Sequence, residues 1–187
     1  MSSKINSRYH DIWTRLRRNK MAMLGLIVLC IIVLAAVFAN VIADYNEMAL
    51  KQNAGERLQP PSWQHWFGTD TYGRDLFARV IHGARASLAI GIISVSIATV
   101  IGVILGATTG YYGGKYSSII MRIVDTFMSI PGIILSLAIV AALGGGARNL
   151  IIAMSVSLAT GFVRITRASV LSVGGQEFIE ASMVTFC

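Results

Sequence analysis

The residue types that most often carry chemistry are sparse in this 187-residue sequence and do not cluster. The three histidines, His10, His65 and His82, lie far apart along the chain, so they predict no metal site. The two cysteines, Cys30 and Cys187, offer neither a disulfide framework nor a paired ligand spacing. The sequence also contains no convincing arrangement of paired carboxylates or of a nucleophile with its base.

A glycine-rich stretch, residues 110–116, has only the outline of a phosphate-binding loop. Thr109 stands where the first required glycine belongs, and Tyr116 replaces the Ser or Thr that binds magnesium. We therefore expect that this chain is not an enzyme and does not hydrolyse ATP by that route.

The charges of most interest fall inside or beside apolar runs: Arg122, Asp125, Arg164 and Arg167. Ionisable side chains at membrane depth are costly, and they usually face a polar interior or each other. Arg164 and Arg167 lie three apart on one helix face. For these two arginines the alternative is ordinary anchoring at the cytoplasmic end of a helix.

Apolar runs long enough to cross a bilayer must position these charges. The chain is 55% hydrophobic and 13% charged, with a mean hydropathy of +0.65, which is apolar for a soluble domain. A bilayer core needs about 20 apolar residues as a helix. We predict an all-α integral membrane fold with about four transmembrane helices, at residues 21–43, 86–109, 123–143 and 147–168.

The basic residues set the predicted orientation. Six of them precede the first span against one acid, Asp11, which places the amino terminus in the cytoplasm. Alternation then puts 44–85 outside the cell membrane, the turn near 111–122 inside and the tail after 163 inside. This topology accounts for nearly all of the net charge of +7. The charge therefore needs no nucleic-acid partner.

The outside segment changes character along its length. It is polar as far as Pro60 and Pro61, and Trp63 and Trp66 then suit an interfacial aromatic belt. Apolar and charged residues alternate at helical spacing after that, which predicts an amphipathic interfacial helix near 73–85.

Two glycine patterns predict how the spans pack. Gly102, Gly106 and Gly110 repeat every four residues and would let another helix approach closely. General glycine enrichment of membrane helices is the alternative. Pro131 and Gly132 interrupt the third span and predict a kink.

The motifs together resemble one family, the C-type permease subunit of dipeptide, oligopeptide and nickel ABC importers. The most specific match is the outside motif FGTD-x-x-GRD, which comprises Phe67, Gly68, Thr69, Asp70, Gly73, Arg74 and Asp75. Further matches are the segments 15–20, 83–85, 110–114, 121–125 and 163–167.

The resemblance implies the front part of a type I ABC importer permease fold. It also implies a permease subunit that forms part of the translocation pathway with a second permease subunit, two ATP-binding subunits and an extracytoplasmic substrate-binding protein. ATP and Mg would be bound by those partners, and this chain would carry no cofactor. By the same resemblance, Glu177, Glu180 and Ala181 enter the ATPase-docking loop. The cargo stays open between a dipeptide, an oligopeptide and nickel.

The match breaks near the end of the sequence, where Ser182 and Phe186 depart from the docking-loop pattern. We therefore expect three parts: 1–61, with the first span; 62–85, the outside loop and interfacial helix; and 86–187, a permease domain incomplete at its carboxyl end.

The alternative function is a non-transporting membrane protein, either a truncated permease-like fragment or an assembly partner. Asp70, Arg74 and Asp75 are expected to hold the outside loop together, to contact the binding protein or to gate the pathway.

Overall fold

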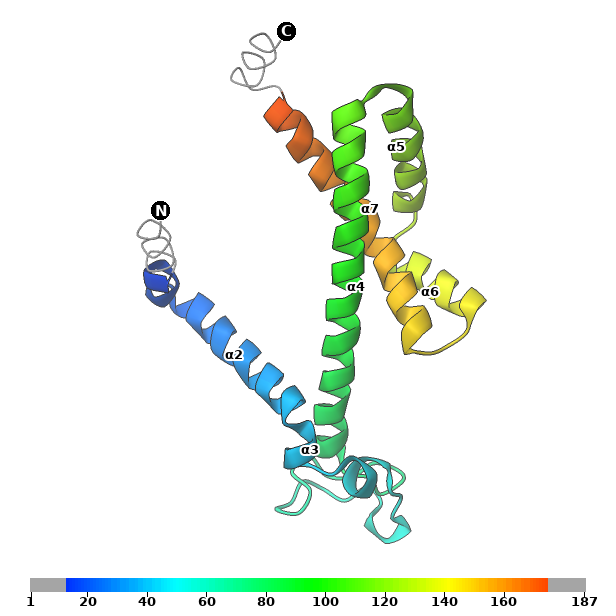
Figure 1. Cartoon of the computed structure of the whole chain (residues 1–187). Helices are drawn as coiled ribbons and strands as arrows, with labels where there is room; N and C mark the ends of the chain where they lie inside the picture. The colour runs from blue at the N-terminus through cyan, green and yellow to red at the C-terminus, as the bar shows by residue number, and fades with distance from the viewer. Residues whose placement is uncertain (1–12, 175–187) are drawn as a thin grey trace. The chain divides into compact units, whose positions relative to one another are not determined.

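Helices joined by loops make up the structure, a computed structural model that describes residues 13–174 (Figure 1). Within these residues the only β-type pairing is an isolated bridge between Thr69 and Asp75. The predicted all-α class is confirmed. The chain divides into two compact units, Met1–Ser87 and Leu88–Cys187, which are described separately.

The first span consists of α2, Lys20–Val37, and one further turn, α3, Ala39–Ile42. Asn19 begins α2, since its side-chain oxygen accepts hydrogen bonds from the amides of Met21 and Ala22 at 3.1 and 3.2 Å. Of the residues of α2, only Ala36 is buried. An apolar helix that the described residues of its own unit leave uncovered requires lipid or further protein around it.

The outside segment is more ordered than its polar composition indicates. It contains a π-helical turn, η1, Tyr45–Leu50, and a 3-10 turn, η2, Ala54–Glu56. Asp44 caps η1 by accepting hydrogen bonds from the amides of Asn46 and Glu47. His82 contacts the end of α3, with its Nε2 3.0 Å from the carbonyl oxygen of Ala43.

One helix, α4, runs without interruption from Leu76 to Tyr112. The predicted helix near 73–85 is present from Leu76, but it continues into the second span without a break, because residues 76–85 form the first turns of α4. The sequence offers no break there: Gly83 is tolerated within a helix, and Ala84, Arg85 and Ala86 are good helix formers.

The third apolar run forms two helices, α5, Gly114–Met128, and α6, Gly132–Leu143, so no single helix extends over 123–143. The two axes differ by 88°, at the position where the sequence indicated an interruption. Pro131 has an extended backbone (ψ 130°) and lacks an amide hydrogen, and a proline also disfavours helical geometry in the residue before it. The hydroxyl of Ser157 donates to the carbonyl of Gly132 at 3.0 Å and holds the start of α6.

The last described helix, α7, spans Ala147–Gly174 and is longer than the predicted 147–168. In the described part of the chain, α2, α4 and α7 are each long and apolar enough to cross a membrane. The bent pair α5 and α6 raises the count to four if it forms one span.

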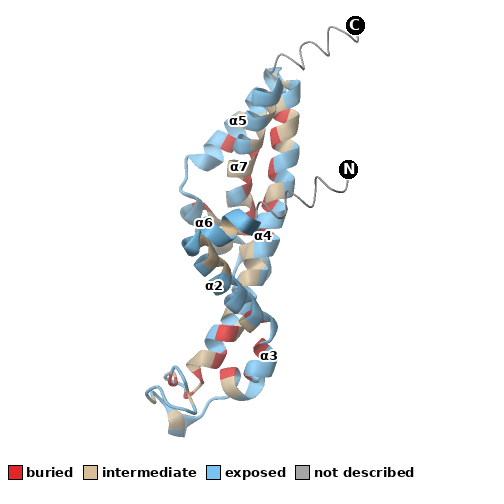
Figure 2. Cartoon of the chain, turned by 90° about the vertical axis from the view of Figure 1, so that its left-hand side faces the viewer, coloured by how far each residue is buried: buried red, intermediate tan, exposed pale blue. Residues whose placement is uncertain are grey.

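Within the second unit α4 and α7 pack in parallel along a stripe of small residues. A Cβ built on Gly102 would lie 2.3 Å from the Cβ of Phe162, and one built on Gly110 would lie 2.8 Å from the Cβ of Val170. Gly106 lies between them, against Val163 and Thr166. Figure 2 marks buried residues in red along both helices. Glycine is required here because any side chain would force the two backbones apart.

The variant Gly106→Leu should separate α4 from α7, because a Cβ at this position would lie 2.6 Å from the carbonyl oxygen of Val163. Overpacking of this kind costs about 1–3 kcal/mol, so the thermal unfolding midpoint of the purified protein should fall. Gly91→Leu is the matched control, because no atom lies within 4 Å of a Cβ built on Gly91. Equal midpoints for the two variants would contradict the close packing.

Candidate functional site

Asp70 organises the outside motif. Its carboxylate accepts hydrogen bonds from the backbone amides of Tyr72 and Arg74 at 2.8 and 3.0 Å. It also pairs with the guanidinium groups of Arg74 and Arg79, at 2.7 and 2.6 Å. The Asp70 side chain is only 12% exposed, so this residue holds the loop from within.

The two glycines of the motif are fixed by backbone geometry. Gly68 and Gly73 have φ values of +75° and +72°, which residues with a side chain rarely adopt. A Cβ on Gly73 would lie 1.9 Å from the carbonyl oxygen of Asn53, and a Cβ on Gly68 would lie 2.4 Å from that of Gln59. The motif therefore specifies a tight fold of the loop.

Asp75 joins this loop to α4. One carboxylate oxygen accepts a hydrogen bond from the amide of Ala78 at 2.8 Å and caps the helix, and the other lies 2.8 Å from Nδ1 of His65. Of the two motif aspartates, Asp70 is the one that pairs with Arg74 in the described residues. Phe67 packs edge-on against Phe77 of α4, and the hydroxyl of Thr69 donates to the carbonyl of Glu56.

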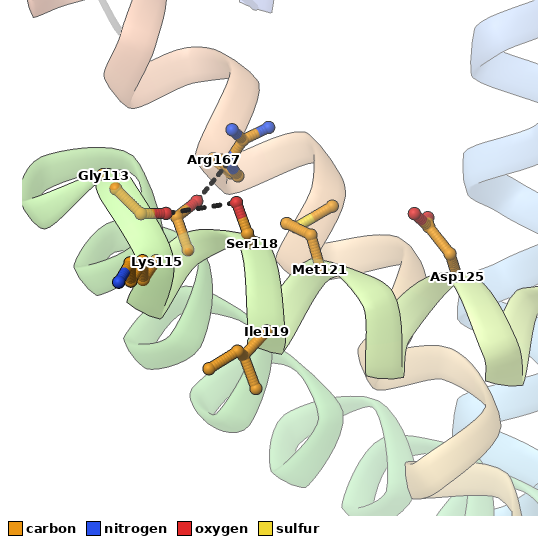
Figure 3. Close-up of a pocket in the computed structure, with 9 residues that line it drawn as sticks. Gly113, Lys115, Ser118, Ile119, Met121, Asp125 and Arg167 are labelled. Carbon is orange, nitrogen blue, oxygen red and sulfur yellow. Dashed lines mark hydrogen bonds between the residues drawn. The ribbon is translucent and has the colours of Figure 1, made fainter.

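The second cluster lies between α5 and α7, within the second unit. Asp125 of α5 forms an ion pair with Arg164 of α7. Arg167, one turn further along α7, donates from Nε to the hydroxyl of Ser117 at 3.1 Å (Figure 3). Arg122 is exposed and forms no ion pair among residues 13–174.

The Asp125–Arg164 pair is not enclosed by the described residues, since the two side chains are 57% and 52% exposed. Asp125 and Arg164 fall within the predicted spans 123–143 and 147–168. Exposure to lipid hydrocarbon would be costly for either charge. The pair must therefore face water or another polar surface.

A groove of about 880 Å³ opens beside this cluster between α5 and α7 (Figure 3). Its lining combines basic, hydroxyl and apolar groups with one carboxylate, that of Asp125. The residues are Gly113, Gly114, Lys115, Ser117, Ser118, Ile119, Met121, Asp125 and Arg167. Among the described residues no group of three or more His, Cys, Asp or Glu side chains could hold a metal ion.

The three residues assigned to ATPase docking, Glu177, Glu180 and Ala181, lie outside the described residues. The structure adds residues that the sequence did not single out. Ser94 and Ala98 extend the four-residue period of the α4 glycines, and this signal was available in the sequence. The contacts of His65 with Asp75 and of Ser117 with Arg167 span ten and fifty residues and carry no local signal.

These features define a multi-span integral membrane protein with polar groups set among its membrane helices. Two family models match the chain: the N-terminal transmembrane domain of oligopeptide transport permease C over residues 7–61, and the binding-protein-dependent transport system inner membrane component over residues 98–185. The chain belongs to this family of C-type permeases.

Named relatives agree with the family models. The chain is 39% identical to the dipeptide transport system permease protein of Alkalihalophilus pseudofirmus over 176 residues. This match covers 94% of the chain and 57% of that protein. It is 40% identical over 180 residues to the glutathione transport system permease protein of Escherichia coli, covering 96% of this chain and 59% of that protein. The chain thus spans a little over half the length of these relatives, which are transport permeases and not enzymes.

The pKa of the Asp70 carboxyl provides a test of the outside motif. Burial alone would raise this pKa, but hydrogen bonds from the Arg74 side chain and from the amides of Arg74 and Tyr72 outweigh burial and lower it well below 3.8. A lowered folded-state pKa stabilises the loop above about pH 4, and this stabilisation is lost as the pH falls below the ordinary value.

The variant Asp70→Asn should make the amides of residues 67–75 exchange with deuterium at least about tenfold faster at pH 7. Hydrogen bonds to a charged group contribute about 1.5–3 kcal/mol, and the amide side chain loses this contribution. The difference between the proteins should shrink below pH 4. Glu47→Gln is the control, because its exposed pair with Lys51 contributes little. Identical exchange in the Asp70→Asn variant and the native protein at pH 7 would refute the role of Asp70.

Proposed function

We propose that this chain is a permease subunit of an ABC importer for small peptides, and that α4, α5 and α7 line part of the translocation pathway. The observation that carries the proposal is the half-exposed Asp125–Arg164 pair, whose members fall within the predicted spans 123–143 and 147–168. Ionisable groups at such depth usually mark a substrate or ion pathway. The dipeptide and glutathione permeases among its relatives favour a peptide over nickel as cargo.

The chemistry of the pair suits a peptide. A free peptide carries a carboxylate and an ammonium group, and each must be matched when it leaves water. Arg164 would meet the peptide carboxylate and Asp125 the ammonium group, so that the ion pair opens in favour of the cargo and closes after it. The helices would change between outward-open and inward-open arrangements, which is the usual course of alternating access.

The proposed assembly includes a second permease subunit, two ATP-binding subunits that carry ATP and Mg, and an extracytoplasmic binding protein. Membership of the binding-protein-dependent family supports these partners. Glu177, Glu180 and Ala181 would contact an ATP-binding subunit. The first of them, Glu177, comes three residues after Gly174, the last described residue of α7.

The proposed orientation has the amino terminus in the cytoplasm. Two observations support it: the basic residues that precede α2, and the parallel packing that brings Gly110 and Val170 to the same end of the second unit. Lys115 and Arg167 also lie at that end.

Cysteine labelling tests this orientation. In a Cys30→Ser, Cys187→Ser background, the Trp63→Cys variant should react with a membrane-impermeant maleimide in intact cells, because position 63 is 96% exposed in the outside loop. The matched Lys115→Cys variant should react only after the cells are permeabilised. The opposite pattern would reverse the proposed topology.

Peptide uptake tests the function. Co-expressed with its partner subunits in cells that lack their own peptide importers, the chain should support ATP-dependent uptake of a radiolabelled dipeptide. Asp125→Asn and Arg164→Gln should each lower uptake at least about tenfold, because each leaves one charge unpaired at membrane depth.

The exchanged variant, Asp125→Arg with Arg164→Asp, separates a role of the pair in assembly from a role in transport. It should recover assembly with the partner subunits, measured by co-purification, because the opposite charges are kept. A complete assembly that transports no dipeptide with the native chain would overturn the proposal. That result would favour a non-transporting assembly partner.

A further inference from the structure

The groove between α5 and α7 carries two basic side chains that no acid among residues 13–174 neutralises. Lys115 and Arg167 line it from different helices, and neither forms an ion pair in the described part of the chain (Figure 3). Arg167 uses Nε to reach Ser117, which leaves its terminal nitrogens for another acceptor. We propose that this groove binds the headgroup of an anionic phospholipid.

The level of the groove along the helices fits a headgroup. The charge-free run 86–109 of α4 ends just before Gly110, which packs on Val170 of α7, and Arg167 lies one turn before Val170. Tyr111 and Tyr112 follow directly and are 80% and 72% exposed. Exposed aromatic rings with a polar tip are enriched at the membrane–water interface.

The lining also changes in the order that a phospholipid requires. Lys115 and Ser118 come first along α5, and the apolar side chains of Ile119 and Met121 follow (Figure 3). The carboxylate of Asp125 lies beyond them and is engaged by Arg164. Phosphate oxygens would thus meet cationic and hydroxyl donors, and the adjoining acyl chain would meet apolar side chains.

Anionic headgroups fit this groove better than zwitterionic ones. Two unpaired cations attract net negative charge, whereas a choline headgroup would bring a third cation beside them. Basic pockets between membrane helices are a recognised mode of binding acidic lipids.

Native mass spectrometry of the purified chain, titrated with phosphatidylglycerol or phosphatidylcholine, tests the proposal. The first phosphatidylglycerol should bind about 30-fold more tightly than phosphatidylcholine, since each basic residue near a lipid surface contributes about a factor of five. The double variant Lys115→Gln, Arg167→Gln should lose this preference. The charge-preserving pair Lys115→Arg, Arg167→Lys should keep it, which shows that the groove still folds.

Arg122→Gln on α5 and Arg148→Gln at the other end of α7 are matched controls, because each removes one positive charge outside the groove. Both should retain the preference. Equal binding of the two lipids by the native chain would overturn the proposal. So would a loss of the phosphatidylglycerol preference in either control as large as the loss in the double variant. Displacement of the lipid by an equal concentration of inorganic phosphate would also overturn it and would indicate a site for free anions.

Discussion

Close packing of α4 against α7 is the interaction on which the second unit depends. Lipid supplies no hydrophobic drive for two apolar helices to associate, so contact must come from close backbone approach and from polar groups. The glycines at 102, 106 and 110 permit that approach. Ser155 adds a polar contact by donating to the carbonyl of Ser94 at 3.2 Å. The parallel arrangement follows, because each contact on α4 is matched about sixty residues later on α7.

This packing also positions the charges. Since α5 begins two residues after α4 ends, the register of α4 on α7 decides which α7 side chains α5 can meet. Arg167 reaches Ser117 near the start of α5, and Arg164, one turn earlier on α7, reaches Asp125 further along α5. A one-turn shift of α7 would break both contacts. The proposed pathway and the proposed lipid groove thus share one structural cause.

Much of this arrangement was predictable from local sequence. Apolar length located α2, α4 and α7, and the four-residue spacing of three glycines marked the side of α4 that meets α7. The size of the bend at Pro131 was not predictable, because a proline only removes helical geometry and the angle is set by what the next helix packs against. The partners of Asp70 and Asp75 were equally hidden: both aspartates lie near Arg74 in sequence, yet one binds arginines and the other binds His65.

The length of α4 bears on the aromatic residues of the outside loop. Its charge-free run, 86–109, is about 36 Å long, which is enough to cross the hydrocarbon. Residues 76–85 add about 15 Å of helix. This added part carries Arg79, His82 and Arg85. Trp66 packs on Phe77 at the outer end of these turns, with ring centroids 4.8 Å apart. The aromatic cluster therefore packs on the part of α4 that precedes its charge-free run. Trp66 thus contributes to the packing of the loop against the start of α4, next to Phe67 of the FGTD-x-x-GRD motif, which contacts the same ring of Phe77.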